Sequence, residues 1–341
     1  MHNSVRALPR FVGAGCQRAL NKITERAGHC KRFSSLISLP VKVEAVAERT
    51  CQTYGQGVKW HELQRHVLYM DSKAGYIHRW NAETSESDKH MFHDHTTMFL
   101  PVDKDKYMVS IGPRLCKFEW MGRRITPLVT VDDTKRIRLS DGSCDALGRV
   151  WFGTSHVAYA AADAPTKGAL LCLEPDGALR KHADGVNVSG RVAWSLDRKT
   201  MFYVDPVARQ IAAYDFDIDL GKICHRRVLV DLAGKNSLSR WGYPTDIAVD
   251  SDCNLWVTCC MTGRIVKFDP STGTELNSVS IPSLRPTSLC FGGDHMDEIF
   301  VTTSRLGASD KELEQFPLSG SLFRVTGHGA RGLLENRAPS F

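Results

Sequence analysis

The chain has 341 residues, of which 42% are hydrophobic and 24% are charged, as is ordinary for a soluble globular protein. This composition excludes a mainly disordered chain, a collagen and a coiled coil, and no apolar run approaches the ~20 residues that a membrane helix needs. The eleven cysteines are scattered and form no CxxC pair. This usage favours buried free thiols in a reducing compartment over a disulfide framework.

The whole net charge of +6 lies in residues 1–39, where seven basic side chains accompany a single acid, Glu25. On a helix over residues 10–27, Arg18, Lys22 and Arg26 lie beside an apolar face. This amphipathic, arginine-rich pattern is typical of a mitochondrial presequence, and residues 32–35 (RFSS) resemble a processing site. We therefore expect an N-terminal extension over residues 1–39 and a location in the mitochondrial matrix. An unstructured basic extension on a cytoplasmic protein is the alternative.

The rest of the chain carries 37 basic and 37 acidic side chains, so its net charge is zero. It therefore has no bulk electrostatic reason to bind nucleic acid or an anionic membrane.

From residue 40 onward, short apolar or alternating runs recur between Gly, Asp, Asn and Pro turns, which predicts an all-β body. An aromatic residue follows an Asp after five intervening residues in Asp145–Trp151, Asp197–Tyr203 and Asp250–Trp256. The wider unit is an apolar strand, an Asp-led turn, a strand with an aromatic, then a Gly-led turn and a further strand. Alignment gives six of these units, spaced by about 40–55 residues and beginning near Gly55, His95, Leu139, Ser189, Pro244 and Pro286. Four-stranded propeller blades need this spacing, so residues 40–341 are predicted to form a six-bladed β-propeller of antiparallel blades with aromatic packing between them.

These units resemble the senescence marker protein/gluconolactonase family in its regucalcin-like form, over roughly residues 40–341. The resemblance is carried by YGQGVKWHELQRHVLYMDSKAGYIHRWN, RIRLSDGSCDALGRVWFGTS, WSLDRKTMFYVDPVARQIAAYDFDIDLGKI, GYPTDIAVDSDCNLWV, GRIVKFDPSTG and PTSLCFGG. It implies a divalent metal in the central channel of a six-bladed propeller, used to hydrolyse sugar lactones. Calcium binding is also associated with the family.

The family places its metal ligands in G-E-[SG]-P, S-N-G-L and P-D-G, and a substrate contact in R-x-N-D-G. These stretches read GQGV at 55–58, SGRV at 189–192, PTD at 244–246 and RLSDG at 138–142. The three metal positions therefore hold Gln56, Gly190 and Thr245. Arg138 and Asp141 match the family, and Ser140 replaces the substrate Asn.

The chemistry of the side chains that would face the channel also argues against a tight metal site. The six positions at which the blades would enter the channel carry no charge: Gln56, Thr96, Ser140, Gly190, Thr245 and Thr287. Calcium prefers several oxygens that include carboxylates, and zinc prefers His, Cys or carboxylate. We therefore expect no tight metal site and no cofactor, with calcium or zinc as the cation if the family activity survives.

Two carboxylates remain candidates for catalysis, Asp246 and Asp141. Asp246 lies one residue beyond the family's Asp, so on a regular strand it would point away from the channel, whereas a β-bulge would turn it inward. A rearranged site would use these two groups, with the substrate contacted by a set of four residues: Arg138, Ser140, Gln56 and Arg191.

Two further motifs are weaker. His93 and His95 would share one face of a strand and could chelate zinc or copper, but no third ligand is identifiable, so an exposed strand start is the simpler interpretation. Residues 250–254 begin like a calcium loop, yet Leu255 and Met261 stand where that loop needs Gly and Glu, which favours a hairpin turn. Residues 310–315 predict a short, solvated helical turn.

Three functions remain open. The first is a propeller in which metal-dependent hydrolysis of sugar lactones is weak or lost and which binds a small molecule or a protein partner. The second is an active metal-dependent lactonase with a rearranged site. The third is a protein-interaction propeller that uses its rim loops. We favour the first, because replacement of all three ligand positions is hard to reconcile with the family's chemistry.

Overall fold

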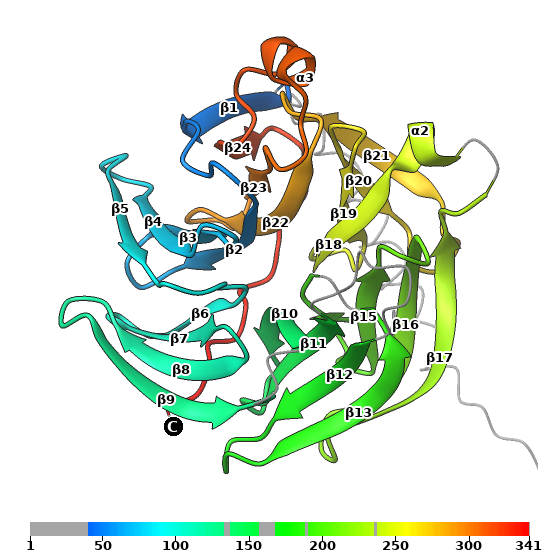
Figure 1. Ribbon diagram of the computed structural model, residues 1–341. Helices are drawn as coiled ribbons and strands as arrows, with labels where there is room; N and C mark the ends of the chain where they lie inside the picture. Colours follow the sequence, from blue (N-terminus) through cyan, green and yellow to red (C-terminus); the bar gives the residue numbers. More distant parts are fainter. Residues whose placement is uncertain (1–39, 133–136, 157–167, 188–189, 235–236, 341) are drawn as a thin grey trace, which may run out of the picture. The chain divides into compact units, whose positions relative to one another are not determined.

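The computed structural model describes residues 40–132, 137–156, 168–187, 190–234 and 237–340 (Figure 1). The predicted N-terminal extension, residues 1–39, lies outside the described residues. The body forms six four-stranded antiparallel sheets arranged around one axis, which confirms the predicted six-bladed propeller (Figure 1).

Each blade is one sheet, whose first strand is the innermost. Blade 1 contains β2 (Gly55–His61), β3 (His66–Asp71), β4 (Tyr76–Asn81) and β5 (Ser87–Met91). Blade 2 contains β6 (Phe99–Asp103), β7 (Lys106–Ile111), β8 (Arg114–Glu119) and β9 (Arg124–Thr130). Blade 3 contains β10 (Ile137–Cys144), β11 (Val150–His156), β12 (Gly168–Leu173) and β13 (Leu179–Val186).

The remaining blades follow in chain order. Blade 4 contains β14 (Ala193–Trp194), β15 (Thr200–Asp205), β16 (Gln210–Asp217) and β17 (Lys222–Asp231). Blade 5 contains β18 (Tyr243–Val249), β19 (Leu255–Cys260), β20 (Arg264–Phe268) and β21 (Glu275–Ser280). Blade 6 contains β22 (Pro286–Gly292), β23 (Glu298–Thr303), β24 (Leu322–Thr326) and, as its outer strand, β1 (Lys42–Ala47).

Strand β1 closes the ring by pairing antiparallel with β24, so that Lys42 lies opposite Thr326. The last blade thereby combines the first and last strands of the body. The sequence prediction did not include this closure, because it treated each blade as one continuous repeat unit.

The repeated Asp and aromatic residues have a direct structural role. The indole N–H of Trp151 donates to Asp145 Oδ2 over 3.0 Å, and that of Trp256 donates to Asp250 Oδ2, also over 3.0 Å. Each Asp also accepts backbone N–H groups of its own turn. Trp256 packs with Phe291 of the next blade, so the aromatic residues are core packing between blades, as predicted.

Among the residues that the structure describes, two short helices lie outside the sheets, α2 (Ser237–Trp241) and α3 (Asp310–Gln315). Helix α3 occupies the segment predicted to form a solvated turn, and the Ser309 hydroxyl caps it by accepting the N–H of Glu312. Within the described ranges, no helix is long and apolar enough to cross a membrane. The described cysteines are free thiols, as predicted.

After β24, residues 327–340 cross one end of the propeller, and we call this segment the C-terminal strap (Figure 1, red). Gly332 pairs with Asp250 of blade 5, and Asn336 pairs with Cys144 of blade 3. The N–H of Ala338 donates to the carbonyl of Pro101 in blade 2 over 2.8 Å. The strap therefore ties several blades together at the end where their inner strands finish.

Candidate functional site

The inner strands that surround the axis are irregular. Their pairing with the second strand of the blade shifts register between Gln56 and Lys59 in β2, and between Leu139 and Gly142 in β10. A further shift lies between Pro244 and Asp246 in β18. Because a bulge changes which face a side chain takes, these shifts allow residues expected on the outer face to turn toward the axis. For Asp246, the sequence left open a regular strand or a β-bulge that turns its side chain inward. The structure contains the bulge.

Asp246 and Arg191 form a buried ion pair, with 3.1 Å between Arg191 Nη2 and Asp246 Oδ2 and at most 2% of either residue exposed. The hydroxyl of Ser288 and the N–H of Leu289 also donate to this carboxylate. Burial acts to raise the pKa of Asp246, but the charges of Arg191 and Lys59 outweigh it and hold the pKa below its usual range. Asp246 is therefore a fully engaged anion.

The guanidinium of Arg191 is engaged on every side. It donates to the carbonyl oxygens of Val58 and Leu289, over 2.7 and 2.6 Å, and forms a second ion pair with Glu335 of the C-terminal strap. Burial opposes its charge, but the carboxylates of Asp246 and Glu335 raise its pKa above the ordinary value. Arg191 thus joins the inner strands to the strap by charge and hydrogen bonds.

Asp141 and Lys59 form a second buried ion pair, in which Lys59 Nζ donates to Asp141 Oδ2 and neither residue is more than 3% exposed. Asp141 Oδ1 also accepts the N–H of Gly142 over 2.8 Å. Burial raises the pKa of Asp141 above its usual range, and Lys59 opposes this effect. The axis therefore holds two cations and two carboxylates, which we call the axial charge cluster (Lys59, Asp141, Arg191 and Asp246).

A cavity of about 280 Å³ lies where the inner strands begin, and we call it the mouth cavity. It brings together three of the predicted substrate contacts, Gln56, Arg138 and Ser140. Arg191 is not among its lining residues, because its side chain is held in the axial charge cluster. The lining also includes four residues that were not predicted as site residues, Tyr54, Lys73, Thr97 and Asn187, together with His95, which was considered only as a metal ligand.

Buried polar atoms around the mouth cavity have no partner among the described residues. These are the Nε donor of Arg138 and the amide oxygen of Asn187. A buried polar group without a partner is costly, so such atoms mark places where a ligand or water is favoured. No Asp or Glu stands among the described residues that line this cavity.

The other predicted channel positions are packed rather than open. Thr96 is fully buried and precedes β6, while its neighbour Thr97 lines the cavity. The hydroxyl of Thr287 donates to the carbonyl of Gly55, and that of Thr245 contacts Thr258 over 2.9 Å. At Gly190 an added Cβ would lie 2.5 Å from the carbonyl oxygen of Thr245, so this position has no room for a ligating side chain.

The weaker metal candidates are not assembled. His93 is exposed in a loop after β5, so the predicted strand at His93 and His95 is absent, and His95 instead lines the mouth cavity. Residues 250–254 form the predicted hairpin turn, with Asp250 engaged by Trp256 and Lys267. Two groups of described residues do bring His, Cys and carboxylate atoms together, and both lie away from the axis: Cys172, Glu174 and His182, and Asp215, Cys224 and His225.

Comparison with known proteins identifies a matching family and a similar relative. The family model described as SMP-30/Gluconolactonase/LRE-like region matches residues 54–305. Human regucalcin is 32% identical over 301 residues, which cover 86% of this chain and 97% of that protein.

Solved structures show the same similarity. A luciferin-regenerating enzyme matches with a TM-score of 0.81 and 26% identity, covering 88% of this chain and 100% of that one. A regucalcin from Agrobacterium tumefaciens, described as a calcium-binding protein, matches with a TM-score of 0.77 and 17% identity over 87% of this chain and 97% of its own, a likeness of fold.

Proposed function

Because the chain belongs to the SMP-30/gluconolactonase/LRE-like family, we propose that its mouth cavity binds a small oxygen-rich molecule, while metal-dependent hydrolysis is weak or lost. The ligand class is a sugar lactone or the sugar acid that forms when the lactone ring opens. The single observation that carries the proposal is that both axial carboxylates, Asp141 and Asp246, already pair with cations of the chain itself.

The side chains at the family's metal positions do not fit a divalent cation. Gln56 offers one amide oxygen, Thr245 one hydroxyl and Gly190 nothing, whereas calcium needs six to eight oxygens that include carboxylates. The nearest carboxylates are neutralised by Lys59 and Arg191. A metal ion would have to displace these buried cations, and each would then remain charged beside it.

The polar groups of the mouth cavity suit an anion with hydroxyl groups. Lys73 and Arg138 supply positive charge, and Gln56 and Ser140 supply groups that both donate and accept hydrogen bonds. The unpartnered atoms of Arg138 and Asn187 offer one donor and one acceptor. A sugar acid can satisfy both with its carboxylate and hydroxyl groups, so we expect it to bind more tightly than the neutral lactone.

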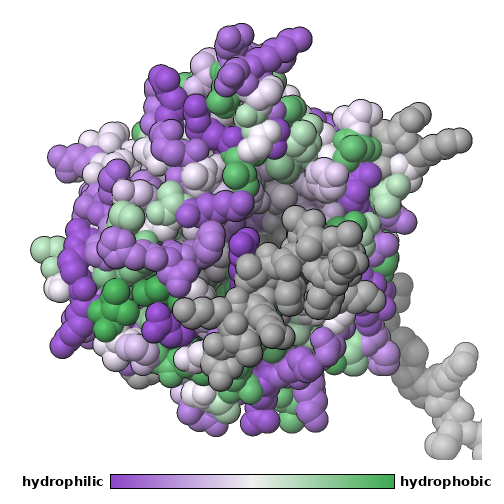
Figure 2. Space-filling model, in the orientation of Figure 1, coloured by the Kyte–Doolittle hydropathy of each residue, from purple (hydrophilic) through white to green (hydrophobic). Residues whose placement is uncertain are grey.

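An active lactonase with a rearranged site would use Asp246 or Asp141 as its base. The lowered pKa of Asp246 makes it a weak base, and its carboxylate is held by Arg191 and Ser288. Neither carboxylate lines the mouth cavity. For the protein-interaction alternative, the described residues of the face in Figure 2 are mostly hydrophilic, with hydrophobic residues in small scattered groups.

The proposal is tested with purified protein, sodium gluconate and gluconolactone. Gluconate should raise the melting temperature, because a ligand of the folded state stabilises it. Arg138→Gln should abolish this shift, whereas Arg114→Gln, which removes an exposed charge at the start of β8, should retain it. Lactone turnover that depends on calcium, zinc or manganese would instead establish the active lactonase. No stabilisation by either compound would refute the ligand class and leave the protein-interaction alternative.

A further inference from the structure

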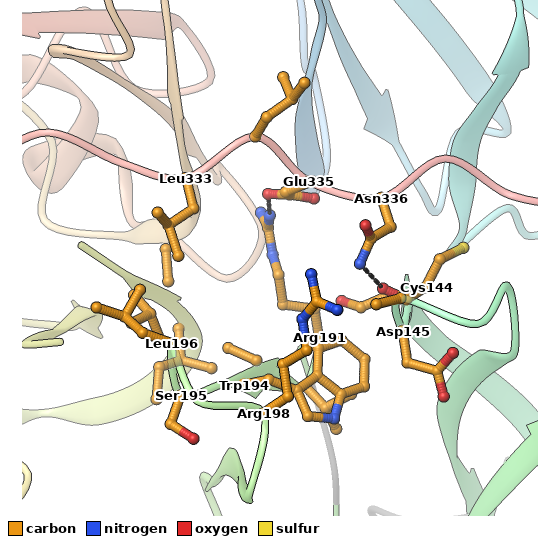
Figure 3. A pocket seen from close by; sticks show the side chains of 18 of the residues that line it. Cys144, Asp145, Arg191, Trp194, Ser195, Leu196, Arg198, Leu333, Glu335 and Asn336 are labelled. Carbon is orange, nitrogen blue, oxygen red and sulfur yellow. Dashed lines mark hydrogen bonds and ion pairs between the residues drawn. The ribbon is translucent and has the colours of Figure 1, made fainter. Parts of the chain in front are cut away.

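A second cavity, of about 380 Å³, lies where the inner strands end, opposite the mouth cavity. We call it the strap cavity. Figure 3 shows Trp194, Leu196 and Arg198 on one side, and Leu333 and Glu335 of the C-terminal strap on the other. Its volume falls within the range of about 300–1,000 Å³ in which proteins hold small ligands.

Three exposed leucines lie in the lining of the strap cavity. Leu196, Leu333 and Leu334 are 44%, 41% and 54% exposed, and they come from two segments far apart in the sequence. Deeper in the cavity, Phe216 and Ile247 are buried. Exposed apolar side chains that gather around one hollow mark a binding site, whereas scattered ones do not.

Trp194 adds a polar group that has no partner. Its indole N–H is buried and makes no hydrogen bond with any described residue. In the neighbouring blades, the indole of Trp151 donates to Asp145 and that of Trp256 donates to Asp250. The buried indole N–H of Trp80 is also unpartnered, but only that of Trp194 belongs to the described lining of the strap cavity, so it leaves one donor beside that cavity.

Arg198 supplies an uncommitted positive charge. Arg198 is an exposed residue of the lining, and its guanidinium forms no hydrogen bond or ion pair with the residues that the structure describes, while its backbone N–H donates to the carbonyl of Ser195. The acids of the lining are already engaged, since Asp145 pairs with Arg149 and Glu335 pairs with Arg191. The charge that remains available in the cavity is therefore positive.

From these groups we propose that the strap cavity binds a small amphipathic carboxylate, a molecule with an apolar body and one acidic head. The apolar body lies against Leu196, Leu333 and Ile247. The carboxylate pairs with Arg198 and accepts the indole N–H of Trp194. This site is separate from the mouth cavity, because the two cavities share none of their described lining residues.

The test uses decanoate as the probe and decanol as its uncharged counterpart, each titrated calorimetrically into the full-length protein. Decanoate should bind more tightly than decanol, since only the acid can pair with Arg198. Arg198→Gln should weaken decanoate binding about tenfold. Lys199→Gln, a neighbouring exposed charge outside the lining, should leave it unchanged. Arg138→Gln in the mouth cavity should also leave it unchanged.

A second measurement locates the ligand. In nitrogen-15 spectra of the labelled protein, decanoate should shift one indole resonance, and that resonance should be missing from Trp194→Phe. Absence of binding, equal affinity for decanoate and decanol, or full affinity in Arg198→Gln would each overturn the proposal. A shift of an indole other than that of Trp194 would place the ligand elsewhere and would also overturn it.

Discussion

Removing the charge of Arg191 tests whether the axial charge cluster works as a unit. In Arg191→Met the side chain keeps most of its apolar stem but loses its guanidinium. Asp246 then stays buried as an unpaired anion, and the carbonyl oxygens of Val58 and Leu289 lose a donor. Breaking a buried ion pair by removing one partner costs about 3–5 kcal/mol. We therefore expect a loss of this size in the free energy of unfolding at neutral pH.

The loss in the free energy of unfolding caused by Arg191→Met should also depend on pH. In the wild type, the pKa of Asp246 is lowered, so its contribution to stability is complete above the unfolded value of about 3.9 and is lost as the pH falls further. In Arg191→Met, burial is no longer opposed by Arg191, and the pKa of Asp246 should rise. The folded variant then takes up a proton that the unfolded chain does not bind, so its destabilisation should be smaller at about pH 5 than at about pH 8.

Urea unfolding followed by tryptophan fluorescence measures both effects. Arg324→Met is the matched control, because Arg324 pairs with Glu44 at a site where both side chains are partly exposed. Such a pair contributes about 0–1 kcal/mol. If Arg191→Met lost no more stability than this control, the axial cluster would not be a structural unit. If Arg191→Met fails to fold, Asp246→Asn provides the same comparison with the other partner.

Three further predictions follow from the packing, the titration and the sequence. Burial lowers the pKa of His78 to about 4, so stability should fall by on the order of 1 kcal/mol per pH unit as the pH drops from about 6.5 to 4, and His78→Gln should flatten this slope in acid unfolding curves. Gly190→Ala should cost about 1–3 kcal/mol in urea unfolding, because its Cβ would lie 2.5 Å from the Thr245 carbonyl oxygen. Gly234→Ala, where no atom lies within 4 Å of the added Cβ, should change stability by less than about 0.5 kcal/mol, and equal losses would show that Gly190 is not constrained. A fluorescent reporter fused to residues 1–45 should enter mitochondria, and diffuse cytosolic fluorescence would contradict the predicted presequence.

The fold could be predicted because several blades repeat the same local chemistry. An Asp that caps a turn and an aromatic residue that packs against the next blade recur at fixed spacing, and both are visible in the sequence. Ring closure and the C-terminal strap are different, because each depends on partners far apart in the chain. Arg324 pairs with Glu44, and Glu335 pairs with Arg191. No local sequence pattern predicts either pair.

The site could be predicted only in part. Gln56, Arg138 and Ser140 do meet in one cavity, since they lie in the first halves of the inner strands β2 and β10. The axial pairs could not be foreseen, because alternation along a regular strand gives the wrong face once a bulge intervenes. Lys59, which pairs with Asp141, is not among the predicted site residues. The catalytic roles assigned to Asp141 and Asp246 stay predictions.

The central claim is that the chain's own cations occupy the place where the family's chemistry requires a metal. Calorimetric titration of the wild-type protein with calcium tests it most directly, with the double variant Gln56→Glu, Thr245→Asp as the reference, because it adds a carboxylate at two of the family's metal positions and leaves Gly190 and the Arg191–Asp246 pair unchanged. We predict that the wild type binds calcium no more tightly than about millimolar and that the variant binds more tightly. Micromolar binding by the wild type would contradict the account.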